Sequence, residues 1–261
     1  MSESGKDSEL EMTAKGSIPT ERQTYEQTYV RSLFNRIAPH YDFLNHFLSL
    51  GFDIRWRRKA VSLLRGYEPQ TILDVATGTA DLALEACKPP VQKVYGIDLS
   101  PTMLEYAKDK IRRRGLEHKI AVEEGSAEQL RFPDDLFDAV MVAFGIRNFS
   151  DLQEGLQEMF RVLRPGGALM ILEFSRPRRT PFKQIYSFYF TRILPRLGGV
   201  VSRSPEAYQY LPSTVQAFPD SDAMIKILAA IGFVGAFQHR LTLGIATVYL
   251  AEKPVQLQSK E

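Results

Sequence analysis

The chain of 261 residues is 44% hydrophobic, which is enough for one large α/β domain with a buried core. Its 33 basic and 31 acidic side chains nearly cancel, so the overall charge does not favour a nucleic-acid or other polyanionic partner. A single cysteine, Cys87, excludes an intramolecular disulfide and favours a reducing compartment, which we take to be the cytoplasm.

Residues 1–22 are polar and contain no apolar run, which predicts a disordered tail rather than a signal peptide. Residues 24–64 are predicted to form two or three helices, interrupted at Pro39 and Gly51, that cover the sheet as a lid. We expect a single domain over 23–253 and a C-terminal tail over 254–261. The sequence contains no run of about eighteen apolar residues, so no transmembrane helix is predicted.

From Thr71 onward, apolar strand-like runs alternate with helix-period segments, a pattern typical of βα units around a parallel sheet. The predicted strands are 71–75, 93–98, 119–124, 137–143, 168–174, 233–238 and 247–251. The predicted helices are 81–88, 101–114, 152–163, 180–194 and 222–231. Ser100 is the expected N-cap of the second helix. Only 242–246 separates the last two strands, which should therefore form an antiparallel hairpin at a sheet edge.

A turn of small residues follows the first predicted strand and precedes a helix, where a nucleotide-binding sheet approaches its ligand. Asp98 ends the second strand, in a place where a carboxylate can accept both hydroxyl hydrogens of a ribose. The loop contains Gly78 alone, whereas a dinucleotide fingerprint requires three glycines to hold a pyrophosphate. Asp74 and Thr79 suit an amino-acid group instead, with Asp74 meeting an ammonium. This combination favours S-adenosylmethionine, although the turn alone is equally consistent with a tight structural connection.

Several segments between Tyr29 and Ala251 resemble the ubiquinone/menaquinone biosynthesis C-methyltransferases. They are 41–45 (Tyr-Asp-Phe-Leu-Asn) with Ser49 and Trp56, 144–148 (Phe-Gly-Ile-Arg-Asn), 161–167 with 173–175, and 208–211 (Tyr-Gln-Tyr-Leu). The Arg-Pro-Gly-Gly turn at 164–167 is common to many methyltransferases, whereas the first two blocks are specific to this family.

The resemblance implies the class I methyltransferase fold, a seven-stranded doubly wound sheet with a terminal antiparallel hairpin and an N-terminal helical lid. It assigns cofactor contacts to Thr79, Asp98, Ser126 and Ala127. The turn at 124–128 is where an adenine is expected to lie, although Ser126 is equally compatible with a helix cap. The chain departs from the family pattern at Leu44, Asp53, Ala80 and Ala143.

The resemblance also implies C-methylation of demethylmenaquinol to menaquinol, with a polyprenylated quinol as substrate. Arg147 is expected to stabilise a phenolate and Asn148 to orient a quinol oxygen, while Tyr210 or Asp42 relays a proton. A structural ion pair for Arg147 and a packing role for Tyr210 are the competing interpretations. The histidines lack metal-ligand spacing, so no metal is expected.

Alternative functions remain open at this point. They are methylation of a ubiquinone-precursor benzoquinol, methylation of another phenol or a sterol, and a non-catalytic cofactor-binding role within a quinone-synthesis complex. The sequence does not indicate an oligomeric state.

One stretch of the chain concentrates the positive charge. Residues 176–203 carry seven basic residues and no acid, interleaved with aromatic and aliphatic side chains. Such a segment suits the surface of an anionic membrane, which predicts reversible peripheral contact at the inner face of the membrane. A core-packed or dimer-forming helix is the alternative interpretation.

Overall fold

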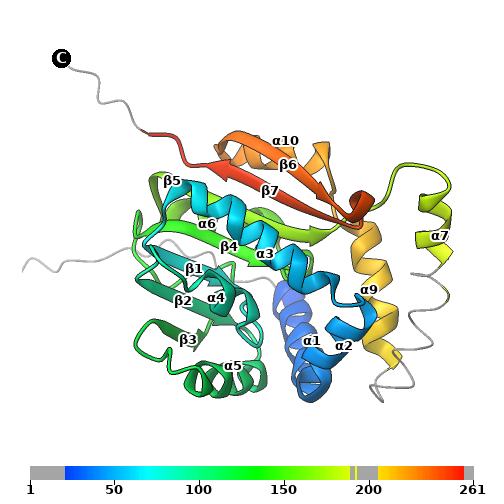
Figure 1. The fold of residues 1–261 in the computed structure, drawn as a ribbon, viewed down its shortest axis with the longest axis horizontal. Helices are drawn as coiled ribbons and strands as arrows, with labels where there is room; N and C mark the ends of the chain where they lie inside the picture. Colours follow the sequence, from blue (N-terminus) through cyan, green and yellow to red (C-terminus); the bar gives the residue numbers. More distant parts are fainter. Residues whose placement is uncertain (1–20, 189–191, 193–204, 256–261) are drawn as a thin grey trace, which may run out of the picture.

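A computed structural model describes residues 21–188, 192 and 205–255 (Figure 1). Its sheet has seven strands in the order β3-β2-β1-β4-β5-β7-β6. The first five in this order are parallel, whereas β7 runs antiparallel to both β5 and β6. The strands are β1 Thr71–Val75, β2 Lys93–Asp98, β3 Ile120–Glu124, β4 Phe137–Ala143, β5 Leu163–Phe174, β6 Val234–Leu241 and β7 Ala246–Glu252. The predicted doubly wound sheet and its terminal hairpin are therefore confirmed.

Helices cover both faces of this sheet and the carboxyl ends of its strands. The helices are α1 Glu21–Ile37, α2 Tyr41–Leu48, α3 Phe52–Leu64, α4 Asp81–Ala86, α5 Pro101–Arg113, α6 Leu152–Val162, α7 Phe182–Phe188, α9 Pro205–Ala217 and α10 Asp222–Ile231. One core joins α3, α4 and α5 to the sheet, and a second joins α6 and α10 to the opposite face. Helices α1 and α2 form the lid at the carboxyl ends of the strands (Figure 1).

Because both faces of the sheet are covered, its central strands are mostly apolar and buried along their length. In β7, Val248 and Leu250 belong to the first core, while Tyr249 and Ala251 belong to the second. This double burial explains why the central strands are continuous apolar runs in the sequence. As predicted, the Ser100 hydroxyl caps α5 by accepting the N–H of Met103 at 3.1 Å.

The structure differs from the predicted elements mainly where a turn or a proline changes the pattern. Strand β5 begins at Leu163 instead of residue 168, because Leu163 pairs with Phe137 before the glycine turn. Helix α4 ends at Ala86, since the following prolines offer no N–H group to extend it. The predicted helix 180–194 is α7, and its residues 189–191, 193 and 194 lie outside the described residues.

Helix α9 was not predicted, because Pro212 lies inside it and proline usually ends a helix. Its Val215 is nevertheless buried, against Leu33 of α1 and Met103 of α5 in a third, smaller core. None of the described helices is both long enough and apolar enough to cross a membrane.

Two loops at the carboxyl ends of β1 and β4 approach each other closely. A Cβ atom on Gly145 would lie 2.6 Å from the Cβ of Ala76, a distance that neither backbone can accommodate without moving. Gly66 lies in an open turn, where an added Cβ would meet nothing within 4 Å. These two glycines form a matched pair for a test of this close contact.

We predict that Gly145→Ala lowers the free energy of unfolding by about 1–3 kcal/mol, the usual cost of overpacking. Gly66→Ala should leave it unchanged or raise it by up to about 1 kcal/mol, because alanine restricts the unfolded chain. Urea denaturation measures both effects. An unchanged stability of Gly145→Ala would contradict the packing described here.

Candidate functional site

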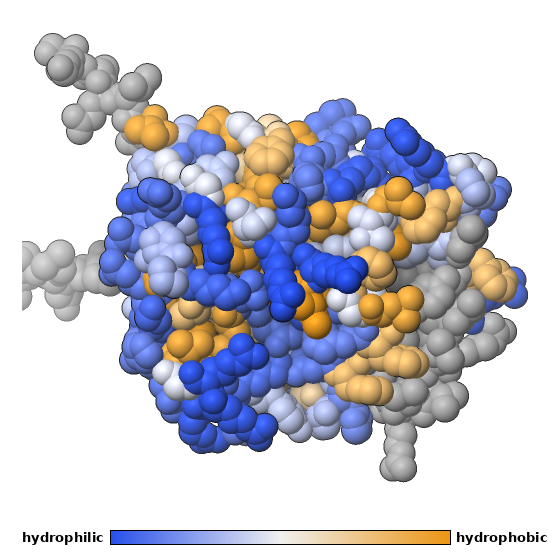
Figure 2. Space-filling model, in the orientation of Figure 1, coloured by the Kyte–Doolittle hydropathy of each residue, from blue (hydrophilic) through white to orange (hydrophobic). Residues whose placement is uncertain are grey.

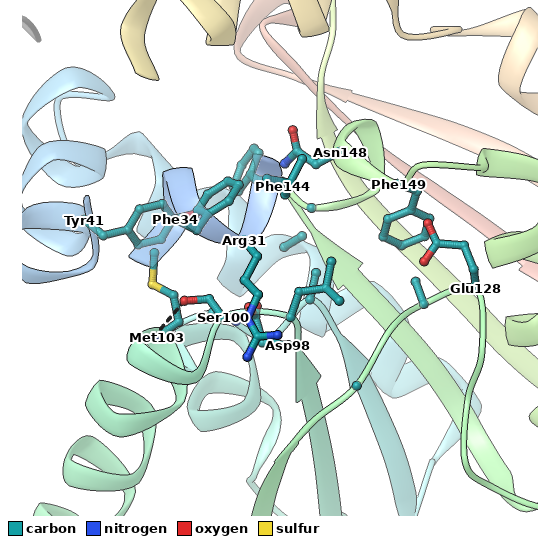
Figure 3. A pocket seen from close by; sticks show the side chains of 18 residues that line it. Arg31, Phe34, Tyr41, Asp98, Ser100, Met103, Glu128, Phe144, Asn148 and Phe149 are labelled. Atoms are coloured by element: carbon teal, nitrogen blue, oxygen red, sulfur yellow. Dashed lines mark hydrogen bonds between the residues drawn. The ribbon is translucent and has the colours of Figure 1, made fainter. Parts of the chain in front are cut away.

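A pocket of about 640 Å³ opens at the carboxyl ends of β1, β2 and β4, beneath α1 and α2 (Figure 3). The strand order reverses between β1 and β4, which is where doubly wound sheets bind their ligands. The pocket is lined by Val30, Arg31, Phe34, Tyr41, Ala76, Gly78, Asp98, Leu99, Ser100, Met103, Gly125, Ala127, Glu128, Ala143, Phe144, Gly145, Asn148 and Phe149.

The loop between β1 and α4 is built to bring its backbone close to a ligand. Gly78 has a φ of +56°, and a Cβ there would have the Tyr41 ring at 3.9 Å as its near contact. Ala76 and Ala80 also adopt left-handed conformations, with φ of 54° and 66°. Ala80 therefore has a backbone conformation that glycine would adopt most easily. The loop exposes backbone rather than side chains to the pocket.

Asp98 stands at the end of β2, as predicted, and lines the pocket. Its carboxylate accepts the N–H of Gly78 on one oxygen and the N–H of Ser100 on the other, both at 2.8 Å. Burial raises the pKa of Asp98 to about 6, although these two N–H groups lower it. Each oxygen retains further acceptor capacity, so the carboxylate can receive two hydroxyl groups of a ligand.

Asp74 lies deeper, in a smaller hollow of about 400 Å³ that also contacts Gly78 and Thr79. The two hollows share Tyr41, and they therefore adjoin each other beneath α2. Asp74 accepts the hydroxyl of Thr77 at 2.6 Å, and burial raises its pKa to about 7. Asp74 thus lines a hollow, and its contact with the ammonium of an amino-acid group stays a prediction.

Thr79 and Asp42 are joined in a polar network between the lid and the cofactor loop. The Thr79 hydroxyl donates to Asp42 at 2.6 Å, and Lys110 lies 2.5 Å from the other oxygen of the same carboxylate. Lys110 also pairs with Asp81 at 2.7 Å. Asp42 was expected to relay a proton, but both its oxygens are engaged here and it does not line the larger pocket. Its observed contacts fasten α2 to the loop.

The turn after β3 contributes Ala127 to the pocket lining, whereas Ser126 lies beside it. The Ser126 hydroxyl donates to Glu128, and Gln27 of α1 donates to Ser126 at 3.3 Å. Ser150 donates to Glu128 through its N–H and its hydroxyl, at 2.7 and 2.8 Å. The turn is thus fixed from two sides, and Ser126 is not a helix cap.

Several lining residues were not predicted, notably Glu128 and the α1 residues Val30, Arg31 and Phe34. In Figure 3, Phe34 and Tyr41 of the lid lie on one side of the pocket, opposite Glu128 and Phe149. The spacing of Val30 and Phe34, four residues apart on one helix, is the signal that could have identified them.

Arg147 was expected to project over the cofactor, but its guanidinium faces the sheet. Its Nη1 donates to Glu173 at 2.7 Å and to the carbonyl of Phe144, and Arg147 does not line the larger pocket. Both side chains are buried, Glu173 completely. Burial raises the pKa of Glu173, although Arg147 lowers it. Arg147 is therefore a member of a buried ion pair, as the competing interpretation predicted.

Asn148, the neighbour of Arg147, does line the pocket. Among the described residues, Asn148 Oδ1, Arg147 Nε and Glu173 Oε2 are buried without a hydrogen-bond partner. Buried polar atoms in native proteins nearly always have partners, so these three are candidates for contact with a polar ligand group.

Tyr210 lies on α9, with its ring edge against Tyr29 at 5.9 Å between ring centroids. Burial raises its pKa, although Arg147 lowers it. Tyr210 is outside the pocket lining, and α9 packs against the Ile146–Asn148 turn. The described residues contain no group of three side chains able to hold a metal ion.

Known proteins resemble this chain over most of its length. The model of the ubiE/COQ5 methyltransferase family matches residues 22–253. A demethylmenaquinone methyltransferase of Bacteroides fragilis is 46% identical over 86% of this chain and 92% of its own length. A ubiquinone/menaquinone biosynthesis C-methyltransferase of Geobacter sulfurreducens is 47% identical over 89% of this chain and 91% of its own.

Solved structures agree with the fold. A SAM-dependent methyltransferase from Thermotoga maritima covers 85% of this chain with a TM-score of 0.60, and 99% of its own length is matched. Its sequence identity is 18%, so this likeness bears on the fold alone. The family match and the identity to the curated relatives are decisive: the chain belongs to the ubiE/COQ5 methyltransferase family.

Proposed function

We propose that this protein transfers the methyl group of S-adenosylmethionine to a ring carbon of demethylmenaquinol, forming menaquinol. The observation that carries the proposal is the pocket itself, in which Asp98 and Asn148 line one space partly walled by aromatic side chains. Its curated relatives are named for this reaction or for its ubiquinone counterpart.

The residues present fit the cofactor. Asp98 would accept the two ribose hydroxyls, and Ala127 and the adjoining Ser126 turn would lie against the adenine. The smaller hollow would take the amino-acid end, with the ammonium near Asp74 and the carboxylate near the N–H groups of Gly78 and Thr79. A Cβ on Gly78 would project into the space beneath Tyr41, so the absence of a side chain there leaves room for the ligand.

When bound, the cofactor supplies a methyl carbon that is electrophilic without further activation. The protein must therefore exclude water, align the acceptor ring and raise the electron density of its reacting carbon. Phe34 and Tyr41 of the lid, with Phe144 and Phe149, form apolar walls for an aromatic ring. Asn148 would orient a quinol oxygen.

Arg147 would stabilise the phenolate that develops when the quinol loses its hydroxyl proton. Glu173 fixes the guanidinium by pairing with its Nη1 atom. The Nε atom of Arg147 has no hydrogen-bond partner among the described residues, so its N–H group can donate to the phenolate. Tyr210 of α9 would relay the proton, whereas the paired Asp42 holds the lid in this mechanism.

The proposal is tested by incubating the purified protein with methyl-labelled S-adenosylmethionine and a panel of acceptors. The panel contains demethylmenaquinol, a demethylated ubiquinol precursor and unrelated phenols. Label in the first acceptor is expected. Label in the second supports the ubiquinone alternative, since the name of the Geobacter relative covers both quinones. Label in neither quinol would overturn the proposal.

We also propose that the enzyme is cytoplasmic and meets its polyprenylated acceptor at the inner membrane surface, with residues 176–203 contributing. Arg176 is engaged with Asp220 at 3.1 Å, and Arg178 lies 3.9 Å from Asp222. Arg179, Lys183 and Phe188 are exposed. Residues 189–191 and 193–203 of this stretch lie outside the described residues.

We predict that Asp98→Ala weakens cofactor binding about 100-fold or more. The change removes two hydrogen bonds to a charged acceptor, each worth roughly 1.5–3 kcal/mol. Titration calorimetry measures the affinity, and circular dichroism checks the fold. Glu123→Ala, which removes an exposed acid in register with Ile97 on the neighbouring strand, should bind as wild type.

The same carboxylate makes binding depend on pH. In the protein without cofactor the pKa of Asp98 is about 6, and hydrogen bonds from the ribose hydroxyls favour the ionised carboxylate. The affinity for the cofactor should therefore rise as pH increases through about 6. Asp98→Ala should lose that part of the pH dependence. Unchanged affinity or an unchanged pH profile in this variant would remove Asp98 from the site.

We predict that Arg147→Ala combined with Glu173→Gln lowers turnover about 10²–10³-fold, the scale for one transition-state donor. The second change avoids leaving an unpaired buried charge, which would itself unfold part of the site. Cofactor affinity should stay near that of wild type. Circular dichroism checks the fold of the double variant, and turnover within a few-fold of wild type would make Arg147 structural.

For the basic stretch, we predict that Arg178→Gln, Arg179→Gln and Lys183→Gln together weaken co-sedimentation with anionic vesicles at low salt. Each basic residue near such a surface is worth about 1 kcal/mol. Equal sedimentation of wild type and triple variant would assign this stretch to packing.

A further inference from the structure

Helix α2 presents an apolar surface to solvent. Phe43 is 59% exposed and Phe47 is 47% exposed, and their rings stack one turn apart with centroids at 5.8 Å. Leu50, in the turn that follows, is 79% exposed. Figure 2 shows hydrophobic side chains gathered over α2 and this turn. Large contiguous apolar patches on a soluble protein usually mark a binding surface.

Helix α3 continues this surface with positive charge. Arg55, Arg58 and Lys59 are all exposed, and hydrophilic side chains cover α3 beside the apolar patch in Figure 2. Arg58 lies 3.9 Å from Glu85, too far for a strong hydrogen bond. The only acids within residues 41–67 are Asp42 and Asp53, which are paired inward with Lys110 and Arg57. The exposed charge of this segment is therefore entirely positive.

The same helix reaches the pocket from its other side. Tyr41, at the start of α2, lines both hollows, and Asp42 fastens the helix to Thr79 and Lys110. The exposed phenylalanines and the pocket are thus separated by roughly the 10 Å thickness of one helix. A ligand carrying a long apolar tail would meet this surface next to the pocket.

We propose that the face formed by α2 and α3 docks on an anionic bilayer surface. Phe43, Phe47 and Leu50 enter the boundary between headgroups and acyl chains, while Arg55, Arg58 and Lys59 contact lipid phosphates. The inference rests on the proposed function, since a polyprenylated acceptor resides in the bilayer. The side chains that insert belong to helix α2 of the lid and the turn after it. They do not belong to the basic stretch at 176–203.

Charge decides between a bilayer and a second copy of this chain as the occupant. A two-fold contact would place the same surface on both subunits, so Arg55 and Lys59 of one copy would face the cations of the other, with Glu85 beside Arg58 as the nearby acid. An anionic surface neutralises all of them at once. The mixture of aromatic rings with a flanking basic row is also typical of helices that lie in a membrane interface.

Binding to vesicles of phosphatidylglycerol and phosphatidylcholine tests the proposal. Phe43→Ser/Phe47→Ser should lower partition at least tenfold, because serine does not enter the apolar phase. Arg55→Gln/Lys59→Gln should weaken binding at low salt and reduce its salt dependence. Leu136→Ser/Val234→Ser is the matched control, since these exposed apolar residues lie at the amino ends of β4 and β6, the end of the sheet opposite the lid.

Turnover separates docking from catalysis. The Phe43→Ser/Phe47→Ser variant should methylate a short-chain, water-soluble quinol as fast as wild type, but a long-chain quinol in vesicles at least tenfold more slowly. If wild type methylates neither quinol, the proposed function fails, while vesicle partition still decides on docking. Equal partition of wild type and this variant overturns the docking face. The docking face is also overturned if wild type forms a concentration-dependent dimer that this variant loses while its vesicle binding is unchanged.

Insertion itself is measured with Phe47→Trp. Trp56 is the only tryptophan of the chain and is buried, so the added indole is an exposed reporter against a constant background. Its emission should shift to shorter wavelength when anionic vesicles are added. An unchanged spectrum with vesicles bound would overturn insertion of α2.

Discussion

The site depends on one carboxylate, Asp98, which accepts N–H groups from Gly78 and Ser100 and so ties two loops together. These loops follow the adjacent parallel strands β1 and β2, and the N–H of Thr77 also donates to the carbonyl of Ile97 at 2.9 Å. The bond to Ser100 also sets the start of α5, whose Lys110 reaches back to Asp42 of the lid. The pocket floor and its cover are therefore connected through short, specific contacts.

Charge is neutralised differently around the two parts of the site. On the cofactor side, Asp74 is buried and the nearby Asp98 is partly buried, and desolvation is the main cause that raises both pKa values. A bound cation would stabilise both carboxylates in their ionised form. On the acceptor side, Glu173 neutralises Arg147, so the guanidinium can donate hydrogen bonds without a large desolvated net charge. This arrangement suits a positively charged methyl donor and an acceptor that becomes negative.

The sequence was informative where a residue's role follows from its place on a strand. Strands β1, β2 and β4 and the position of Asp98 were predicted because buried parallel strands are apolar runs with their ligand-facing residues at one end. An ion pair was one interpretation of Arg147, but its partner Glu173 was not predicted, because the two residues are 26 positions apart and meet only after β4 and β5 align. Helix α9 was missed because Pro212 looks like a break.

The central claim is that the methyl group reaches a ring carbon of the quinol. Nuclear magnetic resonance of the product formed from ¹³C-methyl S-adenosylmethionine and demethylmenaquinol tests it directly. The account predicts a labelled methyl group attached to the naphthoquinol ring carbon, with both ring oxygens unmethylated. A labelled methoxy group, or no label in the quinol, would contradict it.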